Sequence, residues 1–191
     1  MGAEVPSIKG SAFQSVLDDL KELVAQGRID PEELANSLTD KDRSLLDGVM
    51  MSISWIPIES YARMLELLAR TEGGDDPIAY LCARGASAAD RLLSGTYQSF
   101  ATEPGSWGVR VGEAMVGMGR LLYNFTEWSF HPETDDVFEV RVSDAKHFPD
   151  VARYTAEGFL KWFVEHAADR ALRVESTRPT QDCIVLRIEP L

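Results

Sequence analysis

Apolar residues recur every three or four positions through the first two thirds of the chain, the spacing that places them on one face of a helix. The first such segment begins at Ser11, which we expect to cap the helix, and Gly27 follows as a stop signal. Its apolar face consists of Phe13, Val16, Leu17, Leu20, Leu23 and Val24.

Capping residues and prolines mark the starts of the helices that follow. Asp30-Pro31 and Asp76-Pro77 each combine an N-cap residue with a proline at the first helical position. Thr39 is a further cap, and Pro57 precedes another amphipathic segment. We therefore expect residues 1–123 to form a mainly helical part.

Near Thr126 the hydrophobic period changes from 3.6 to 2, which indicates strands. Trp128 and Phe130 share one face of a first strand. A second strand alternates apolar and polar residues over 138–143. After a helix over 148–168, two more strands flank a turn that we expect at residues 178–180.

Residues 124–191 thus read as hairpin, helix, hairpin. Two antiparallel hairpins separated by one helix predict an α+β fold, in which an N-terminal helical layer packs on an antiparallel sheet of about four strands. The linkers are short, so we expect a single domain over residues 1–191.

Composition excludes several classes of function. The 191 residues carry a formal net charge of −12 and no run of Lys or Arg, a surface that repels nucleic-acid phosphates and anionic lipids. No apolar run approaches the length of a membrane span, and the N-terminus has no basic, apolar leader. We expect a cytoplasmic protein that binds no nucleic acid.

The chemistry-bearing residues do not form a catalytic or metal-binding pattern. The only histidines, His131, His147 and His166, lack the i, i+4 spacing of a helical zinc site. Cys82 and Cys183 are far apart in the sequence, which fits a reducing compartment. There is no Gly-x-Ser-x-Gly motif either. We expect neither catalytic residues nor a metal, and the protein to be no enzyme.

Glycines gather in the predicted helix over 106–123, at Gly108, Gly112, Gly117 and Gly119. A phosphate-binding loop would need its glycines between a strand and a helix, not inside a helix. These glycines instead favour close packing, with Gly108 and Gly112 leaving a flat face for another helix or for a ligand.

Aromatic residues are concentrated after residue 106. Trp and Tyr carry polar tips that need partners when buried, which suits a cavity for an amphipathic small molecule. The alternative is that they simply fill the core. The aromatic residues are Trp107, Tyr123, Phe125, Trp128, Phe130, Phe138, Phe148, Tyr154, Phe159, Trp162 and Phe163.

The C-terminal part resembles the four-vinyl-reductase-type ligand-binding domain. The resemblance is carried by Gly158-Phe159-Leu160, Val174-Glu175-Ser176 and Asp182-Cys183. Haem–nitric-oxide-binding-like proteins and subunits of the vesicle-tethering TRAPP complex share that fold. The whole chain also resembles an uncharacterised bacterial family of similar length, through Ile8-Lys9-Gly10 and Trp55-Ile56-Pro57.

This sequence departs from the family's metal and haem chemistry. The resemblance places Glu175 and Cys183 at two zinc-ligand positions, but Arg178 stands where a further cysteine is expected. Two ligands cannot close a tetrahedral zinc site. Haem relatives use a histidine in the helical half, whereas every histidine here follows residue 130. We therefore expect no cofactor.

These observations predict a non-enzymatic module, regulatory or sensory, that binds a small molecule or lipid in an aromatic-lined pocket. The ligand would be small and apolar or aromatic. The alternative is a protein-interaction or assembly subunit that forms a homodimer through its helical layer and binds nothing small. The residues expected to line the pocket are Trp107, Met115, Tyr123, Trp128, Phe130, Tyr154 and Phe159.

Overall fold

The computed structural model describes residues 5–101 and 107–191. Short strands β1 and β2 pair antiparallel beside the first helix, a small sheet that the hydrophobic pattern does not predict. The elements of this part are β1 (Ser7–Lys9), α1 (Gly10–Ala25), α2 (Pro31–Ser37), α3 (Asp40–Asp47), β2 (Trp55–Pro57), α4 (Ile58–Glu72), α5 (Pro77–Leu93), η1 (Gln98–Phe100) and α6 (Val109–Leu122).

Most of the predicted helix starts are confirmed. The Asp30 side chain accepts a hydrogen bond from the Glu33 amide at 2.7 Å, and Asp76 accepts one from the Ala79 amide at 2.9 Å. Thr39 forms a capping box at the start of α3. These signals act within four residues, so the surrounding fold does not override them.

The predicted Ser11 cap is wrong. Helix α1 begins at Gly10, and the Ser11 hydroxyl instead hydrogen-bonds the Tyr97 hydroxyl at 2.7 Å. The first amides of the helix are satisfied by the loop before β2, because Gly10 N donates to Ser54 O at 2.8 Å and Ser11 N to Ser52 O at 3.0 Å. No side-chain cap is needed there.

The main sheet has four antiparallel strands, as predicted, and their order is β3-β4-β6-β5. Its elements are β3 (Glu127–Pro132), β4 (Phe138–Ser143), η2 (Ala145–His147), α7 (Asp150–Ala168), β5 (Leu172–Thr180) and β6 (Cys183–Pro190). Arg178, Pro179 and Thr180 are not a turn but the end of β5, with a register shift after Thr177. The chain turns at Gln181 and Asp182.

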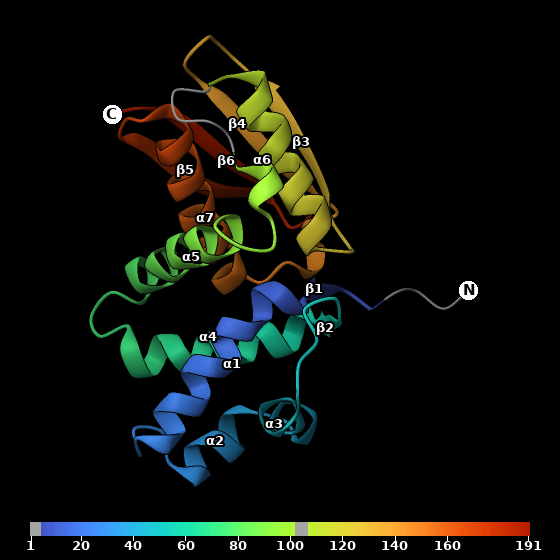
Figure 1. Cartoon of the computed structure of the whole chain (residues 1–191), viewed down its shortest axis with the longest axis vertical. Coiled ribbons are helices and arrows are strands. Elements are labelled where there is room, and N and C mark those ends of the chain that lie inside the picture. Colours follow the sequence, from blue (N-terminus) through green and yellow to red (C-terminus); the bar gives the residue numbers. More distant parts are fainter. Residues whose placement is uncertain (1–4, 102–106) are drawn as a thin grey trace.

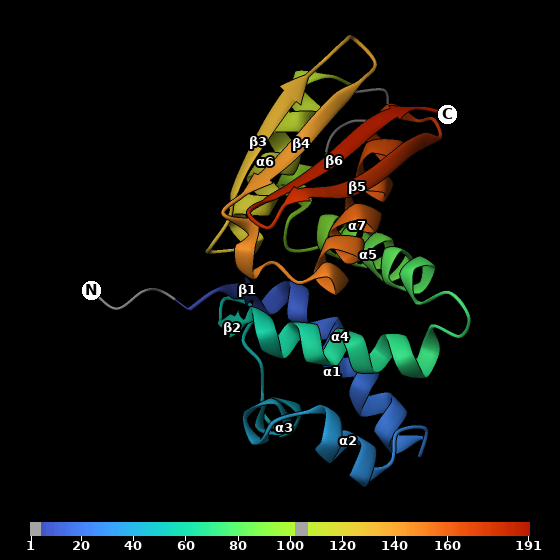
Figure 2. The same cartoon turned by 180° about the vertical axis from the view of Figure 1, so that it is seen from behind.

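The two faces of this sheet differ. Arg141 and Arg187 lie on the outer face, where they pair with carboxylates such as Glu139. Helices α6 and α7 cover the other face, while α1–α4 stack beyond α5 at one end (Figures 1 and 2). The covered face buries Phe138, Val140, Val142, Ile184, Leu186 and Ile188. The α+β fold with helices on one face is therefore confirmed.

Glycines allow the closest contacts beneath this layer. A Cβ on Gly112 would come within 2.0 Å of the Phe130 ring, and one on Gly119 within 2.2 Å of the Trp128 indole. The predicted glycine face of α6 therefore packs on aromatic side chains of β3 and not on another helix. Gly108 lies outside that face, as the residue before the helix, with φ of 77°. No helix of the described chain is long and apolar enough to cross a membrane.

Candidate functional site: a cavity between the helical part and the sheet

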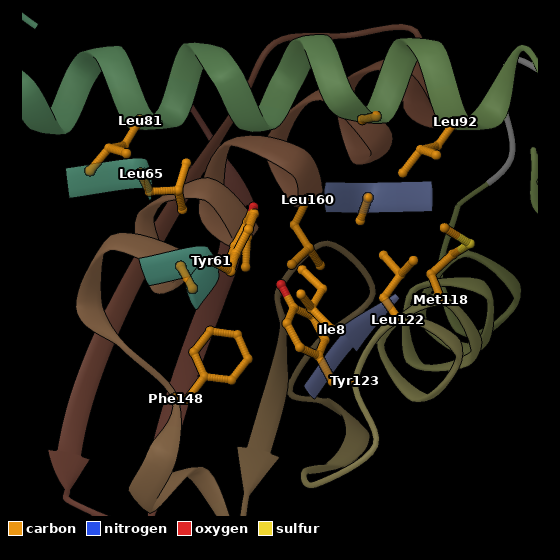
Figure 3. Close-up of a cluster of buried hydrophobic side chains, with 14 of the residues drawn as sticks. Ile8, Tyr61, Leu65, Leu81, Leu92, Met118, Leu122, Tyr123, Phe148 and Leu160 are labelled. Carbon is orange, nitrogen blue, oxygen red and sulfur yellow. The ribbon is translucent and has the colours of Figure 1, made fainter. Parts of the chain in front are cut away.

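An apolar cavity of about 60 Å³ lies where β1, α1 and α4 meet α5, α6, α7 and β3. Figure 3 shows part of the cluster around it, with Ile8, Tyr61, Tyr123 and Leu160 converging from different elements. The apolar side chains of the lining are Ile8, Ala12, Val16, Leu65, Ala88, Leu92, Met115, Met118, Leu122, Trp128, Ala156, Phe159, Leu160 and Phe163.

Tyr123 and Trp128 form one rigid wall of the cavity. Their rings stack with centroids 5.9 Å apart and planes 16° apart, and Phe148 lies 4.8 Å from the Tyr123 ring. The Trp128 indole N–H donates to Thr126 Oγ1 at 3.0 Å, which satisfies its polar group. Gly119 has no side chain, so the indole can lie directly against α6.

Of the seven residues expected to line a pocket, Met115, Tyr123, Trp128 and Phe159 line this cavity. Tyr154 does not: it faces a groove on the surface, where the Arg153 guanidinium lies 4.2 Å from its ring centre. Tyr154 and Phe159 are five residues apart, which rotates them by about 140° around a helix. One helix cannot direct both into the same cavity.

Trp107 and Phe130 also lie outside the cavity lining. The Trp107 indole donates to Asp135 O at 2.8 Å, and its ring packs 5.1 Å from Phe138. Phe130 covers Gly112 and likewise contacts Phe138. It lies on the same face of β3 as Trp128 but two residues further along the strand, which places it about 7 Å away.

The sequence pattern did not single out the polar residues of the cavity, which are Ser15 from α1, Tyr61 from α4, Arg84 from α5 and Thr155 from α7. A signal for Arg84 was present, because it falls between Leu81 and Ala88 at helical spacing, on the apolar side of its helix. Tyr61 and Thr155 carry no such signal, since each fits an ordinary amphipathic helix.

Two tyrosine hydroxyls are buried at the cavity. Tyr61 and Tyr123 are each only 7% exposed. Burial raises the pKa of Tyr61, although hydrogen bonding with the Thr155 hydroxyl opposes the rise. Burial, and then the neighbouring Tyr61, raise the pKa of Tyr123 well above its usual value. Both hydroxyls are therefore neutral, and each can donate a hydrogen bond.

The two hydroxyls differ in their partners within the described chain. Tyr61 has the Thr155 hydroxyl within hydrogen-bonding reach, and that hydroxyl donates its own proton to Ala152 O at 2.9 Å. The Tyr123 hydroxyl has no hydrogen-bond partner among the described residues. An unmet buried donor costs about 1–3 kcal/mol, so the cavity offers unused hydrogen-bonding capacity.

An ion pair crosses the side of the cavity that comes nearest to solvent. Ser15 of α1 and Arg84 and Ala88 of α5 are half-buried lining residues. Arg84 Nη1 lies 2.5 Å from Asp19 Oδ2 of α1 and 3.3 Å from the Tyr80 hydroxyl. The pair links the two helices beside the cavity and neutralises the guanidinium.

The residues that the structure describes contain no cluster of three or more His, Cys, Asp or Glu side chains that could hold a metal ion. Glu175 pairs with Arg187 across the β5–β6 hairpin, four residues along β6 from Cys183. At about 3.3 Å per residue this separates the two candidate zinc ligands by about 13 Å.

Comparisons with known proteins identify the fold. No family model matches the chain, and no curated protein matches it. Among solved structures, the Fe(II) unliganded H-NOX protein from K. algicida has a TM-score of 0.66 at 11% identity, covering 95% of this chain and 96% of that one. A mutant of the T. tengcongensis H-NOX protein has a TM-score of 0.62 at 13% identity, covering 95% and 97%.

A third structure, from work on haem distortion in the H-NOX family, has a TM-score of 0.63 at 13% identity and covers 96% of this chain and 97% of that one. The chain therefore has the H-NOX fold over nearly its whole length, which confirms the expected likeness to haem–nitric-oxide-binding-like proteins.

Proposed function

We propose that this protein is a non-enzymatic sensor or regulatory module that binds a small apolar molecule in the cavity beside Tyr123 and Trp128. The observation that carries the proposal is an apolar cavity with two neutral tyrosine hydroxyls at its wall, those of Tyr61 and Tyr123. Ligand sites of this kind combine mainly apolar walls with a few polar groups that orient the ligand. The likeness to H-NOX proteins, one of them from work on haem distortion, supports the proposal only at the level of the fold.

Haem itself does not fit the residues present. The cavity of about 60 Å³ is about a fifth of the 300 Å³ at which pockets for drug-sized ligands begin, and haem is larger than such ligands. As far as the structure describes the chain, the lining contains Tyr and Met but no His or Cys, the axial ligands of most haem proteins. Its one cation, Arg84, is already paired with Asp19.

The size of the cavity sets the size of the ligand. A cavity of about 150 Å³ accommodates benzene, so 60 Å³ suits a molecule of a few heavy atoms unless the walls move. The walls come from both parts of the chain: Ile8, Tyr61 and Tyr123 from the helical part and Trp128 from β3 of the sheet. A ligand bound between these walls would favour the arrangement of the helical part against the sheet that it fits best. Such a shift in packing would signal that the ligand is bound.

An apolar loop supports the alternative function, a protein-interaction subunit. Between α3 and β2, Val49 is 100% exposed, Met51 63% and Ile53 73%. Exposed apolar groups of this size often mark contact surfaces. Whether the protein forms a homodimer stays a prediction. Substituting Gly112 would not test it, since any side chain there overlaps Phe130.

Xenon binding, followed by chemical shifts in two-dimensional NMR spectra, tests the proposed function, because xenon enters small apolar cavities without needing polar contacts. We expect shifts that saturate with pressure and centre on Met115, Leu160 and their neighbours. Ala88→Leu fills the half-buried edge of the lining and should abolish them. Ala83→Leu, on the exposed face of the same helix, is the matched control. Unsaturated shifts spread evenly over the protein would refute the proposal.

A further inference from the structure

The chemistry of the ligand can be narrowed from the two tyrosines, an inference that rests on the proposed function. Tyr61 comes from the first turn of α4 and Tyr123 from the end of α6, so distant segments bring two phenol groups to one cavity. Figure 3 shows both tyrosines in the same cluster as Leu160 and Ile8, with the hydroxyl oxygens in red.

The Tyr123 ring is held in place and cannot turn its hydroxyl toward solvent. Trp128 stacks on it at 5.9 Å, Phe148 packs at 4.8 Å and Phe125 at 6.1 Å. The residue also pairs with Ile8 through an isolated β-bridge. These contacts hold the ring in place, and the described residues offer its hydroxyl no acceptor.

The lining favours a neutral ligand over an anion. Among the described residues of the lining, Arg84 is the only one with a charged side chain, and Asp19 already pairs with it at 2.5 Å. A carboxylate placed in the cavity would lack a free counter-charge, and burying an unpaired charge is strongly unfavourable. A neutral oxygen acceptor requires only the hydroxyl donors that are present.

We propose that the ligand is a small neutral carbonyl compound, whose apolar body fills the cavity and whose oxygen accepts a hydrogen bond from Tyr123, with Tyr61 as the second donor. The carbonyl oxygen supplies what the cavity lacks, since it has two lone pairs and donates no hydrogen bond of its own. Ordered water could meet the same donors, but it would leave the apolar walls without a matching surface.

A matched pair of probes separates the effect of the carbonyl group from that of the rest of the molecule. Acetone and isobutene each have four heavy atoms and nearly the same shape, and only the ketone accepts a strong hydrogen bond. Each probe is titrated into the full chain and followed by NMR chemical shifts. We expect acetone to bind about tenfold more tightly than isobutene.

Tyr123→Phe removes the hydroxyl and keeps the ring. This variant should weaken ketone binding by about tenfold, leave hydrocarbon binding unchanged, and unfold at no lower temperature than the parent, because the lost group had no partner. Tyr61→Phe should act in the same direction. Tyr97→Phe is the control, since its hydroxyl bonds Ser11 and lies outside the cavity lining.

The outcomes distinguish the two proposals. Equal binding of ketone and hydrocarbon, or ketone binding that survives both Phe variants, overturns the carbonyl assignment and leaves the cavity as a ligand site. Failure of xenon and of every probe to bind overturns the proposed function together with this inference. Ketone preference that both Phe variants abolish supports the assignment.

Discussion

Gly158 of α7 lies directly against the backbone of Cys82 in α5: a Cβ on Gly158 would come within 1.8 Å of the Cys82 carbonyl oxygen. The contact is reciprocal, because a Cβ on Gly85 would come within 1.9 Å of Thr155 O. The two helices thus meet backbone to backbone. Gly85, Thr155 and Phe159 all line the cavity, so this contact sets the position of one of its walls.

Gly158→Ala should therefore destabilise the protein although alanine favours helices. The added methyl cannot be accommodated by moving a side chain, since the atom it meets belongs to backbone, and overpacking of this kind costs about 1–3 kcal/mol or more. Urea denaturation measures the loss. Ser87→Ala, on the exposed side of α5, should change stability by less than about 0.5 kcal/mol. Equal stability of the two variants would contradict the close contact.

A buried ion pair joins α3 to α4 and predicts a pH dependence. The Asp42 side chain is 0% exposed, and Arg63 donates to it at 2.7 and 3.0 Å. Burial opposes its ionisation, but hydrogen bonds from Arg63, Ser60 and Thr39 outweigh burial and hold the pKa of Asp42 well below its usual range. The folded state therefore binds this proton more weakly than the unfolded state.

It follows that Asp42 stabilises the fold fully above its unfolded-state pKa and loses that effect as the pH falls through about 4 and below. Asp42→Asn should lower the free energy of unfolding by about 2 kcal/mol at pH 7. The difference from the parent should shrink as the pH approaches 3, which urea denaturation at several pH values measures. Asp47→Asn, exposed on the same helix, is the control. A difference that does not depend on pH would show that the carboxylate's charge is not responsible.

Arg178 ties the end of β5 to the start of α7. Its guanidinium donates to Ala145 O at 3.1 Å, Gln181 O at 3.0 Å and Phe148 O at 2.5 Å. Arg178→Ala removes these bonds together and should cost about 2–3 kcal/mol in urea denaturation. Arg178→Lys should recover only part of this free energy of unfolding, because an ammonium group lacks the planar guanidinium geometry that reaches three carbonyls.

Arg173→Ala in the same strand is the comparison for Arg178. Its side chain is 54% exposed and lies 3.7 Å from Glu189, so its loss should cost less than about 1 kcal/mol. If the two alanine variants were equally stable, the carbonyl contacts of Arg178 would not contribute to the fold.

Cys82 should be an unreactive thiol. Burial, and then the neighbouring Glu157 carboxylate, raise the pKa of Cys82 to about 11. At pH 8 its thiolate fraction is then about 100-fold below that of a free cysteine, and only the thiolate attacks disulfide reagents. In a Cys183→Ser variant, labelling with an aromatic disulfide should be at least that much slower in the folded protein than in urea. Rapid labelling of the folded variant would place Cys82 in a different environment.

Local features determined much of the fold from the sequence alone. Asp30, Thr39 and Asp76 cap helices through bonds to amides three residues away, and the change of period near Thr126 marks where helices give way to strands. Such interactions span a single turn or one strand. They can therefore be predicted from the sequence, and the α+β architecture followed from them.

Three features could be learned only from the tertiary structure. They are the pairing of β1 with β2, the side of α7 that lines the cavity, and the presence of Tyr61 and Tyr123 at the same cavity. Each depends on segments far apart in the chain, and helical periodicity gives a face without saying which neighbour covers it. Tyr154 and Phe159 both looked suited to a pocket, yet their angular separation on α7 directs one to a surface groove and the other to the cavity. The sequence determined that aromatic residues would be buried together; only packing determined which hydroxyls were left without acceptors, because that depends on every neighbour at once.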